Sequence, residues 1–334
     1  MTVFVSRRAV LLGTAALALA SCAPAGVGPR EIEVADRPSE GGIGGTGIIG
    51  ILNDPATLSI NGLDLAAAPD LEVRDVFGQR QLADLAAGQA LNVEAYRDAD
   101  GMLVARSIGV TYPLIGPIDV VTDSGFRVLG VEVAVEPGAP IMGPDGVEFV
   151  PASGQQVAVS GVWRADDVVA TRVDLLDTST TPVVIAGEVK PGQTGDSVRL
   201  GTVDLALPAD APSPRVGSFV TAIGEPQGDV LSVDRLVAGR FAGSVAPLTR
   251  LSVEGYLEPI TIAPGYAIAG LGHSFDDEAV LDALASSRAL YVGPYDGDFR
   301  VALGLRLPEG FDARRALLAS VGDGFAPEAA VPTR

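Results

Sequence analysis

A repeated pattern of short strands and turns constrains this chain more than any other feature of its sequence. The best-preserved copy, residues 116–177, has short runs of alternating apolar and polar residues, separated by glycine, proline and acidic turns. Such alternation over four to eight residues is typical of β-strands with one buried face. Related patterns precede and follow this copy, which predicts a tandem array of β units.

The first half of each copy contains a hairpin of the form apolar-x-apolar-x-Gly-x-x-apolar. Versions of it occur at residues 58–65, 126–133 and 198–205, with a weaker fourth at 266–270. The first version places Asn61-Gly62 between its two runs, which is a strong signal for a two-residue hairpin turn. Each hairpin follows a strand that begins near a glycine, so this half supplies three strands.

The second half of each copy supplies two more strands. The first of these matches at residues 88–95, 154–161 and 217–224, and a turn then leads to a last strand at 103–106, 168–173 and 230–236. The connector between the halves is mildly helical in the first copy, at residues 80–87. Three strands, a helix and two strands are the order of a five-stranded OB-like barrel. The sequence therefore predicts a mainly β chain of tandem small OB-like five-stranded β-barrel units with short connecting helices.

The repeats resemble a bacterial envelope family, the domain of unknown function 5666. The most similar stretch is residues 154–173, GQQVAVSGVWRADDVVATRV, and the glycine-rich residues 41–47 are also similar. The resemblance covers most of residues 41–237 and fades after Arg250. It implies an OB-like β fold and secretion or lipidation. It implies no known activity, so no catalytic residue is carried over from it.

The N-terminus has the pattern of an export signal. Arg7 and Arg8 precede an apolar segment at residues 9–20, which is too short to span a membrane and fits a signal peptide. The sequence Leu19-Ala20-Ser21-Cys22 resembles the lipobox of bacterial lipoproteins. That resemblance implies cleavage before Cys22, a diacylglycerol on its sulfur and acylation of the new amino terminus. The alternative is a plain signal peptide with an incidental cysteine, although Cys22 is the chain's only cysteine.

The export route and the destination follow from residues beside this signal. Residues 6–11 resemble a twin-arginine export motif, with Val10 where phenylalanine is preferred, and an ordinary basic signal is the equal alternative. Residue 23 is alanine rather than aspartate, which by resemblance to proteobacterial sorting rules favours the outer membrane. We therefore expect a lipid-anchored protein of the bacterial cell envelope, in the outer membrane and facing the periplasm or the surface.

These patterns together predict the organisation of the chain. The expected segments are a lipoprotein signal peptide at 1–22, a flexible tether at 23–45, β units at 46–112, 115–178 and 183–239, a divergent fourth unit with helices at 250–322, and a tail at 323–334. A short strand is expected near residues 31–34, and a terminal helix at 312–321. Units of about 60 residues are marginally stable alone, so neighbouring units should pack together.

Charge and the rare residues exclude several classes of function. The formal net charge is −19, and removal of residues 1–22 leaves 21 basic against 42 acidic residues. Such a surface repels phosphate backbones, so nucleic acid is not an expected partner. One cysteine and one histidine exclude an intramolecular disulfide, a cysteine metal site and a multi-histidine metal site in one chain.

One acidic stretch of the fourth unit invites a catalytic interpretation. His273, Ser274 and Asp276 are the residue types of a catalytic triad, but neighbours at a helix start rarely reach that geometry, and no Gly-x-Ser-x-Gly elbow occurs. Ser274 followed by Asp277 resembles a capping box, and acidic residues 276–278 suit a helix N-terminus. We interpret this stretch as the start of a helix over residues 275–286, with a paired-carboxylate site as the alternative.

Acidic turns recur between the last two strands of each copy, at residues 98–101, 166–167, 228–229 and 296–298. The first resembles a fragment of a calcium loop, but a full loop needs more oxygen ligands. Recurrence at one topological position favours a turn requirement, because Asp and Gly tolerate the backbone angles of turns. Trp163, which could stack on a sugar, is interpreted as a core or rim residue.

The sequence therefore predicts a non-enzymatic, lipid-anchored envelope protein with a structural or protein-interaction role. No catalytic residue, metal site or cofactor is expected. The expected partners are the membrane, through Cys22, and an envelope protein or polysaccharide. The alternative is a binding module for polysaccharide or peptide on an OB-like face, which rests on the fold alone. An enzyme is the third hypothesis, and it would require His273, Ser274 and acidic residues of other copies to meet in one pocket.

Overall fold

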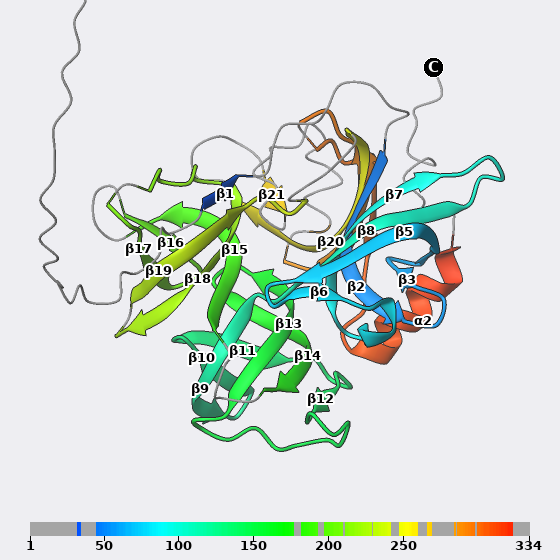
Figure 1. Cartoon of the computed structure of the whole chain (residues 1–334). Coiled ribbons are helices and arrows are strands. Elements are labelled where there is room, and N and C mark those ends of the chain that lie inside the picture. Colours follow the sequence, from blue (N-terminus) through cyan, green and yellow to red (C-terminus); the bar gives the residue numbers. More distant parts are fainter. Residues whose placement is uncertain are drawn as a thin grey trace, which may run out of the picture. The chain divides into compact units, whose positions relative to one another are not determined.

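The computed structural model describes residues 32–34, 45–176, 182–192, 197–209, 211–228, 230–241, 247–259, 266–268, 284, 286–297 and 299–322 (Figure 1). All of them belong to one compact unit, residues 31–334. Most of the described elements are β-strands, as predicted. In this part of the chain, no helix is long and apolar enough to cross a membrane.

The best-preserved repeat folds into a closed barrel, here called barrel 2. Its strands are β9 (Leu114–Thr122), β10 (Gly125–Val128), β11 (Val131–Val135), β13 (Gln156–Arg164) and β14 (Asp167–Leu175). The pairings close a ring in the order β9-β10-β11-β14-β13, and only the β11–β14 pair is parallel. This is the strand order of an OB-like barrel, so the fold prediction is confirmed. Side chains such as Phe126, Val157 and Val173 fill its core.

The following repeat forms barrel 3 with the same ring. Its strands are β15 (Val183–Pro191), β16 (Val198–Leu200), β17 (Val203–Ala206), β18 (Phe219–Gln227) and β19 (Val230–Ala238). Again the third and fifth strands, β17 and β19, form the parallel pair, and the other pairs are antiparallel. Barrels 2 and 3 also join through β9 and β15, where Leu114 pairs with Ile185.

The first repeat forms barrel 1, whose third strand is interrupted. The strands are β2 (Gly45–Asp54), β3 (Ser59–Ile60), β4 (Leu63–Asp64), β5 (Ala66–Asp75), β6 (Gly78–Arg80), β7 (Ala90–Arg97) and β8 (Leu103–Thr111). The ring runs from β2 through β3 to β4, continues past Leu65 into β5, and returns through β8 and β7. Asn61 and Gly62 have φ angles of 57° and 80°, so the predicted two-residue hairpin turn is confirmed.

The repeated glycine that ends the motif Gly-x-x-Val-x-Val-x-Gly has a structural cause. In barrels 2 and 3, the register between the fourth and fifth strands shifts at Gly161 and Gly224. A Cβ atom at either glycine would collide with the carbonyl oxygen of the opposite strand, from Val169 or Ser232. The motif therefore marks a bulge where the two backbones approach closely.

The connectors between the third and fourth strands differ among the barrels. In barrel 1, the 3-10 helix η1 (Leu82–Asp84) is capped reciprocally by Gln81 and Asp84. In barrel 2, the connector instead contains the short strand β12 (Ile141–Met142) and turns. Four prolines, at positions 137, 140, 144 and 151, interrupt any helical run there. Among the described residues, η1 is thus the one helix that connects strands within barrels 1–3.

The fourth unit is an antiparallel sheet attached to barrel 1. Its strands are β20 (Leu248–Pro259), β21 (Tyr266–Ile268), β22 (Arg288–Pro294) and β23 (Leu303–Arg306), ordered β21-β20-β22-β23. Strand β20 pairs in parallel with β2, which extends the sheet of barrel 1. The predicted terminal helix is confirmed as α2 (Phe311–Val321). The predicted helix at 275–286 lies outside the described residues except for residues 284 and 286.

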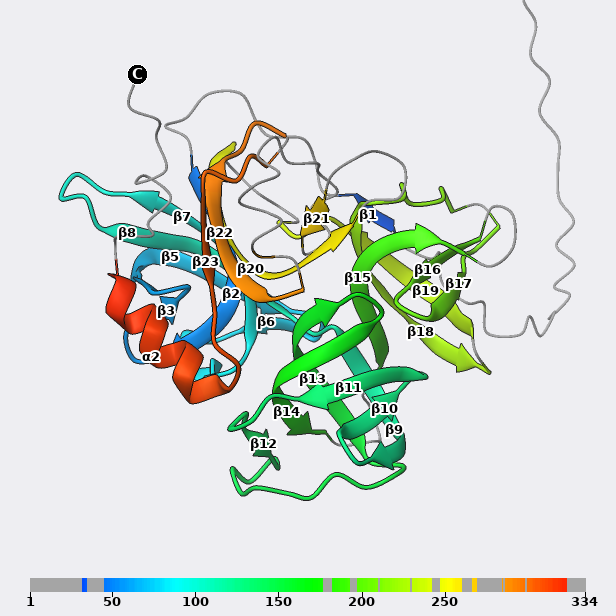
Figure 2. The same ribbon diagram turned by 180° about the vertical axis from the view of Figure 1, so that it is seen from behind.

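Helix α2 and barrel 2 both pack on barrel 1. The backbone of Leu318 in α2 leaves no room for a Cβ atom at Gly62, and both views show α2 beside β3 (Figure 1 and Figure 2). On the other side, Thr171 Oγ1 of β14 donates a hydrogen bond to the Gly88 carbonyl oxygen at 2.6 Å. Arg172 Nη1 donates to the Ala87 carbonyl oxygen at 3.2 Å. The expected packing between neighbouring units is therefore present.

Strand β1 (Ile32–Val34) confirms the short strand expected near residues 31–34, but its partner was not foreseen. It pairs in parallel with the end of β19, so a segment that precedes barrel 1 in sequence lies against barrel 3.

Candidate functional site

The residues of the predicted export signal lie outside the described residues: Arg7, Arg8, Leu19, Ala20, Ser21 and Cys22. The acidic stretch of the fourth unit also lies outside them, from His273 to Glu278. The structure therefore neither assembles nor separates the residues of these two sequence hypotheses.

The acidic turns do have described side chains, and these support turn conformations. Asp98 Oδ1 accepts hydrogen bonds from the backbone amides of Asp100 at 3.0 Å and Met102 at 2.8 Å, and Gly101 has a φ of +83°. Asp166 stands in a turn after Ala165 and forms an ion pair of 3.0 Å with Lys190, the only lysine. Among the described residues, no group of three or more His, Cys, Asp or Glu side chains is placed to hold a metal ion.

Trp163 is a joint between barrels 2 and 3. Its Nε1–H donates a hydrogen bond of 2.7 Å to the carbonyl oxygen of Ala186 in β15. Its ring packs so closely on Gly187 and Gly201 of barrel 3 that a side chain at either position would meet it at 3.0 Å or less. The half-buried indole also packs against the shared apolar cluster of these barrels. Trp163 is therefore a core and rim residue, as interpreted from the sequence.

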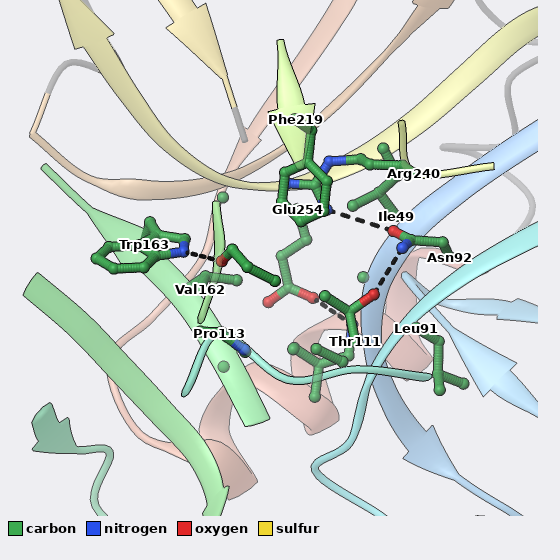
Figure 3. A pocket seen from close by; sticks show the side chains of 16 residues that line it. Ile49, Leu91, Asn92, Thr111, Pro113, Val162, Trp163, Phe219, Arg240 and Glu254 are labelled. Carbon is green, nitrogen blue, oxygen red and sulfur yellow. Dashed lines mark hydrogen bonds between the residues drawn. The ribbon is translucent and has the colours of Figure 1, made fainter. Parts of the chain in front are cut away.

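A small cavity lies where all four units meet (Figure 3). Asn92 of barrel 1 donates to Thr111 Oγ1 at 2.7 Å and accepts from Arg240 at 3.4 Å. The Arg240 guanidinium lies 3.7 Å from the centroid of the Phe219 ring. The cavity volume is about 40 Å³, which is room for one or a few water molecules. This junction is a packing joint and is too small for an organic ligand.

Beside this junction, four charged side chains form a buried cluster, here called the ion quartet. Its members are Glu136, Glu254, Arg288 and Arg314, whose side chains are at most 5% exposed. Arg288 lies 3.2 Å from the Glu136 carboxylate and 2.8 Å from that of Glu254, and Arg314 lies 3.5 Å from each. The two positive and two negative charges balance, which is the condition under which buried ions are tolerated.

The ion quartet joins segments that are far apart in the sequence. Glu136 follows β11 of barrel 2, Glu254 and Arg288 belong to β20 and β22 of the fourth unit, and Arg314 is in α2. Arg314 also donates a hydrogen bond of 3.1 Å to Asn53 Oδ1 of barrel 1. One cluster therefore connects barrel 1, barrel 2, the fourth unit and the terminal helix.

A larger cleft opens next to the ion quartet, between barrel 2 and the fourth unit. Its volume is about 440 Å³, which is within the usual range of small-molecule sites. Apolar groups of Val135, Val169 and Leu307 line it together with the side chains of Arg164, Tyr256 and Arg306. The Arg164 guanidinium lies 6.0 Å from the centroid of the Tyr256 ring.

The polar groups of this cleft favour an anionic ligand. Arg164 and Arg306 are exposed, and Glu309 is the exposed carboxylate among its described lining residues. The buried Glu136 and Arg288 belong to the neutral ion quartet and leave this balance unchanged. In a chain with 42 acidic and 23 basic residues, a cleft lined by two exposed arginines and one exposed carboxylate departs from the negative charge of the whole.

A second ionic cluster joins barrel 3 to the fourth unit. Lys190 of β15 bridges Asp166 at 3.0 Å and Glu258 of β20 at 3.1 Å. Burial of the neighbouring Glu188, reinforced by the negative charge of Glu258, raises the pKa of Glu188 to about 7, against the opposing charges of Lys190 and Arg240. This carboxyl group therefore changes charge near neutral pH.

Sequence reasoning did not single out the ion quartet or the cleft. Their residues come from separate repeats and match no motif. One signal was present for the quartet, because Arg288 opens the otherwise apolar strand β22 and a charge in a buried strand needs a partner. The partner itself, Glu254, is 34 positions earlier in the chain, and no local pattern pairs the two.

The fold and these joints define a protein of tandem OB-like barrels. Residues 46–109 and 115–174 each match the family described as "Domain of unknown function (DUF5666)". These matches are consistent with two repeats of this domain, one in barrel 1 and one in barrel 2, and they confirm the resemblance for these two segments.

Other comparisons add little. No curated protein matches the chain. Among solved structures, one titled "drosophila Unr CSD456" is similar over 47% of this chain and 76% of its own, with 13% identity and a TM-score of 0.18.

Proposed function

We propose that this protein is a non-enzymatic, lipid-anchored protein of the bacterial cell envelope with a structural or protein-interaction role. The observation that carries the structural part is the ion quartet, which ties barrel 1, barrel 2, the fourth unit and α2 together through fully desolvated charges. Such a joint suits a rigid body that presents surfaces rather than one that opens during a reaction cycle.

The anchoring part of the proposal rests on the sequence Leu19-Ala20-Ser21-Cys22. A lone cysteine at the position that a lipobox requires is consistent with an acylated N-terminus, since two or three acyl chains hold a protein stably on a bilayer. The proposed location is the outer membrane, with the barrels in the periplasm or on the surface. Export by the twin-arginine route, through Arg7 and Arg8, stays an alternative to the general route.

Membrane fractionation of the full-length protein tests the anchor. The Cys22→Ala variant should lose its acyl chains and disappear from the outer-membrane fraction, whereas the control Ala25→Ser should remain in that fraction and be processed. Globomycin, which blocks lipoprotein signal cleavage, should cause the unprocessed form of the native sequence to accumulate. Equal association of Cys22→Ala and the native protein with the outer membrane would refute the anchor.

A second candidate function is that of a binding module for polysaccharide or peptide. The cleft of about 440 Å³ between barrel 2 and the fourth unit supports it, because the cleft combines an apolar lining with the guanidinium groups of Arg164 and Arg306. Guanidinium groups recognise carboxylates through paired hydrogen bonds, so acidic polysaccharides or peptides with an exposed carboxylate are the favoured ligands.

A binding screen on the chain from residue 22 onward, with Cys22→Ser to prevent lipidation, tests this candidate. Acidic envelope polysaccharides and acidic peptides should be retained, and neutral ones should not. Arg164→Ala should weaken retention at least fivefold, while the exposed Arg215→Ala in barrel 3 should leave it unchanged. If no acidic ligand is enriched, or if both variants behave alike, the cleft is not the binding site.

A further inference from the structure

The fifth strand of each barrel extends beyond its parallel partner, the third strand. In barrel 2, β11 covers β14 only at residues 168–170. In barrel 3, β17 covers β19 only at residues 230–232. The remaining half of each fifth strand would expose unpaired backbone groups on one side, and such an edge invites another strand.

In barrels 1 and 2, a later part of the same repeat covers this edge with a second parallel segment. In barrel 1, β5 resumes after an irregularity and pairs at Glu72–Arg74 with Ser107–Gly109 of β8. In barrel 2, β12 pairs with Val173 and Asp174 of β14. Barrels 1 and 2 thus each cover this edge with a segment of their own repeat.

Barrel 3 differs, because the described residues of its connector, 207–209 and 211–217, contain no strand. The edge of β19 is covered instead by β1, whose residues Ile32, Glu33 and Val34 pair with Leu236, Val237 and Ala238. The covering segment comes from a part of the chain that is about 200 positions earlier, before barrel 1. Figure 1 and Figure 2 both show β1 beside β19.

The register of β1 matches that of the two internal segments. The shift between the fourth and fifth strands gives a common reference, because it falls at Glu94/Ala95, Ser160/Gly161 and Ile223/Gly224. At each shift the register skips one residue of the fifth strand, and the residue two positions after it faces the covering segment. These fifth-strand residues and their partners are Ile108 with Val73, Val173 with Ile141, and Leu236 with Ile32. All three covering segments are therefore parallel, and each places a β-branched residue at the same point.

We propose that residues 32–34 are a donated strand that completes barrel 3, and that the edge of β19 at Leu236–Ala238 is a strand-binding site whose ligand is this chain's own N-terminal segment. Backbone hydrogen bonds to the open edge supply the affinity, as in other cases of strand addition. Pro29 and Pro38 lie on either side of the segment in the sequence, and proline cannot donate a hydrogen bond to a ladder.

The donation sets how far the first docked strand can lie from the proposed anchor, a consequence that rests on the proposed function. With β1 docked, ten residues join Cys22 to Ile32, and a fully extended chain of that length spans about 35 Å. Without this pairing, the next described strand begins at Gly45, and a fully extended chain from Cys22 to that residue spans about 80 Å. Docking of β1 therefore shortens the maximum span from the proposed anchor to the first docked strand from about 80 Å to about 35 Å.

Disulfide trapping tests the donation directly, because Cys22 is the only cysteine. In the soluble chain from residue 22 onward with Cys22→Ser, the pair Glu33→Cys and Val237→Cys should oxidise to an intramolecular disulfide, since paired residues on neighbouring strands lie within bridging distance. The matched control combines Glu33→Cys with Asp174→Cys, at the equivalent edge of barrel 2, which Met142 already covers.

We expect at least tenfold more intramolecular disulfide in the Glu33–Val237 pair than in the control pair. Equal trapping of both pairs, or a disulfide that forms only between two molecules, would overturn donation within the chain. Because this protein carries no lipid, its result is independent of the anchor, and the fractionation of Cys22→Ala is in turn independent of β1.

Hydrogen exchange supplies a second readout. Glu33→Pro should raise amide exchange at Leu236–Ala238 at least tenfold relative to Glu40→Pro, while exchange at Val173 and Asp174 stays unchanged. An excess of a synthetic peptide of residues 29–38 should restore protection, and the same peptide with proline at position 33 should not. Unchanged exchange in Glu33→Pro, or no rescue by the native peptide, would contradict a strand-binding site on β19.

Discussion

At the scale of single residues, burial rather than sequence position determines how the charged groups behave. The exposed acids of the turns satisfy nearby backbone amides, as Asp98 does. Glu188 and the ion quartet, in contrast, are held among other buried groups, where each lost partner leaves a charge without compensation. Two predictions follow from these differences.

The first concerns Glu188, whose folded-state pKa of about 7 is above the ordinary value of 4.5. The folded protein holds this proton more tightly than the unfolded chain does, so Glu188 stabilises the fold fully below pH 4.5 and loses that contribution as pH rises through 7. Glu188→Gln should remove up to about 3 kcal/mol of this decline in the free energy of unfolding. Urea unfolding at pH 5 and pH 8 measures it, with the exposed Glu225→Gln as the control. Identical pH profiles for Glu188→Gln and the native protein would contradict the assignment.

The second concerns Arg314, which is fully buried and contacts both acids of the ion quartet. Arg314→Met leaves Glu136 and Glu254 with one cation and should lower the free energy of unfolding by about 3–5 kcal/mol. The neighbouring Arg315 is exposed, so Arg315→Met should change it by less than about 0.5 kcal/mol. Similar unfolding midpoints for the two variants would show that the quartet does not hold the units together.

At the scale of elements, the motif Gly-x-x-Val-x-Val-x-Gly specifies a strand and, in some copies, also a contact between barrels. Its first glycine has a positive φ in barrels 1 and 2, at Gly88 (91°) and Gly154 (84°). Gly88 faces the backbone of Thr171 in barrel 2, whereas no atom lies within 4 Å of the Cβ position at Gly154. The same motif position is therefore a barrel joint in one copy and a free turn in the next.

This contrast gives a matched pair of variants. Gly154→Ala pays only the backbone cost of a positive φ, about 1–2 kcal/mol. Gly88→Ala pays the same cost and also collides with the Thr171 carbonyl, so it should be more destabilising by a further ~1–3 kcal/mol. Chemical unfolding of both variants measures the difference. Equal destabilisation would mean that barrels 1 and 2 separate without cost.

At the scale of the whole molecule, the barrels and the fourth unit share more contacts than a string of independent barrels would. Barrel 1 shares a sheet with the fourth unit through β2 and β20, and barrels 2 and 3 share one through β9 and β15. The ion quartet adds contacts between side chains of barrel 2 and the fourth unit, and the Trp163 side chain bonds to the backbone of barrel 3. The described part of the chain should therefore unfold as one body.

Cooperativity is measurable with a single intrinsic probe. Trp163 is the only tryptophan and reports on the joint of barrels 2 and 3, while far-UV circular dichroism reports on all strands. The two signals should give coincident urea transitions. A tryptophan transition that precedes the loss of strand signal would instead indicate barrels that unfold independently.

The sequence by itself determined the local structure of this protein. Alternating residues, Asn61-Gly62 and the recurring acidic turns encode strands and hairpins through backbone preferences that act over a few residues. Their order within a repeat then gave the OB-like barrel, and residues 312–321 gave the terminal helix.

Only the tertiary structure decided which segments meet. The ion quartet, the cleft around Arg164 and Tyr256, and the pairing of β1 with β19 join residues that are separated by tens to hundreds of positions. The physical reason is that a charged residue or an open strand edge requires a partner but does not specify where in the chain that partner lies. The best-preserved repeat therefore predicted its own barrel, while the completion of barrel 3 by the N-terminal segment appeared only in three dimensions.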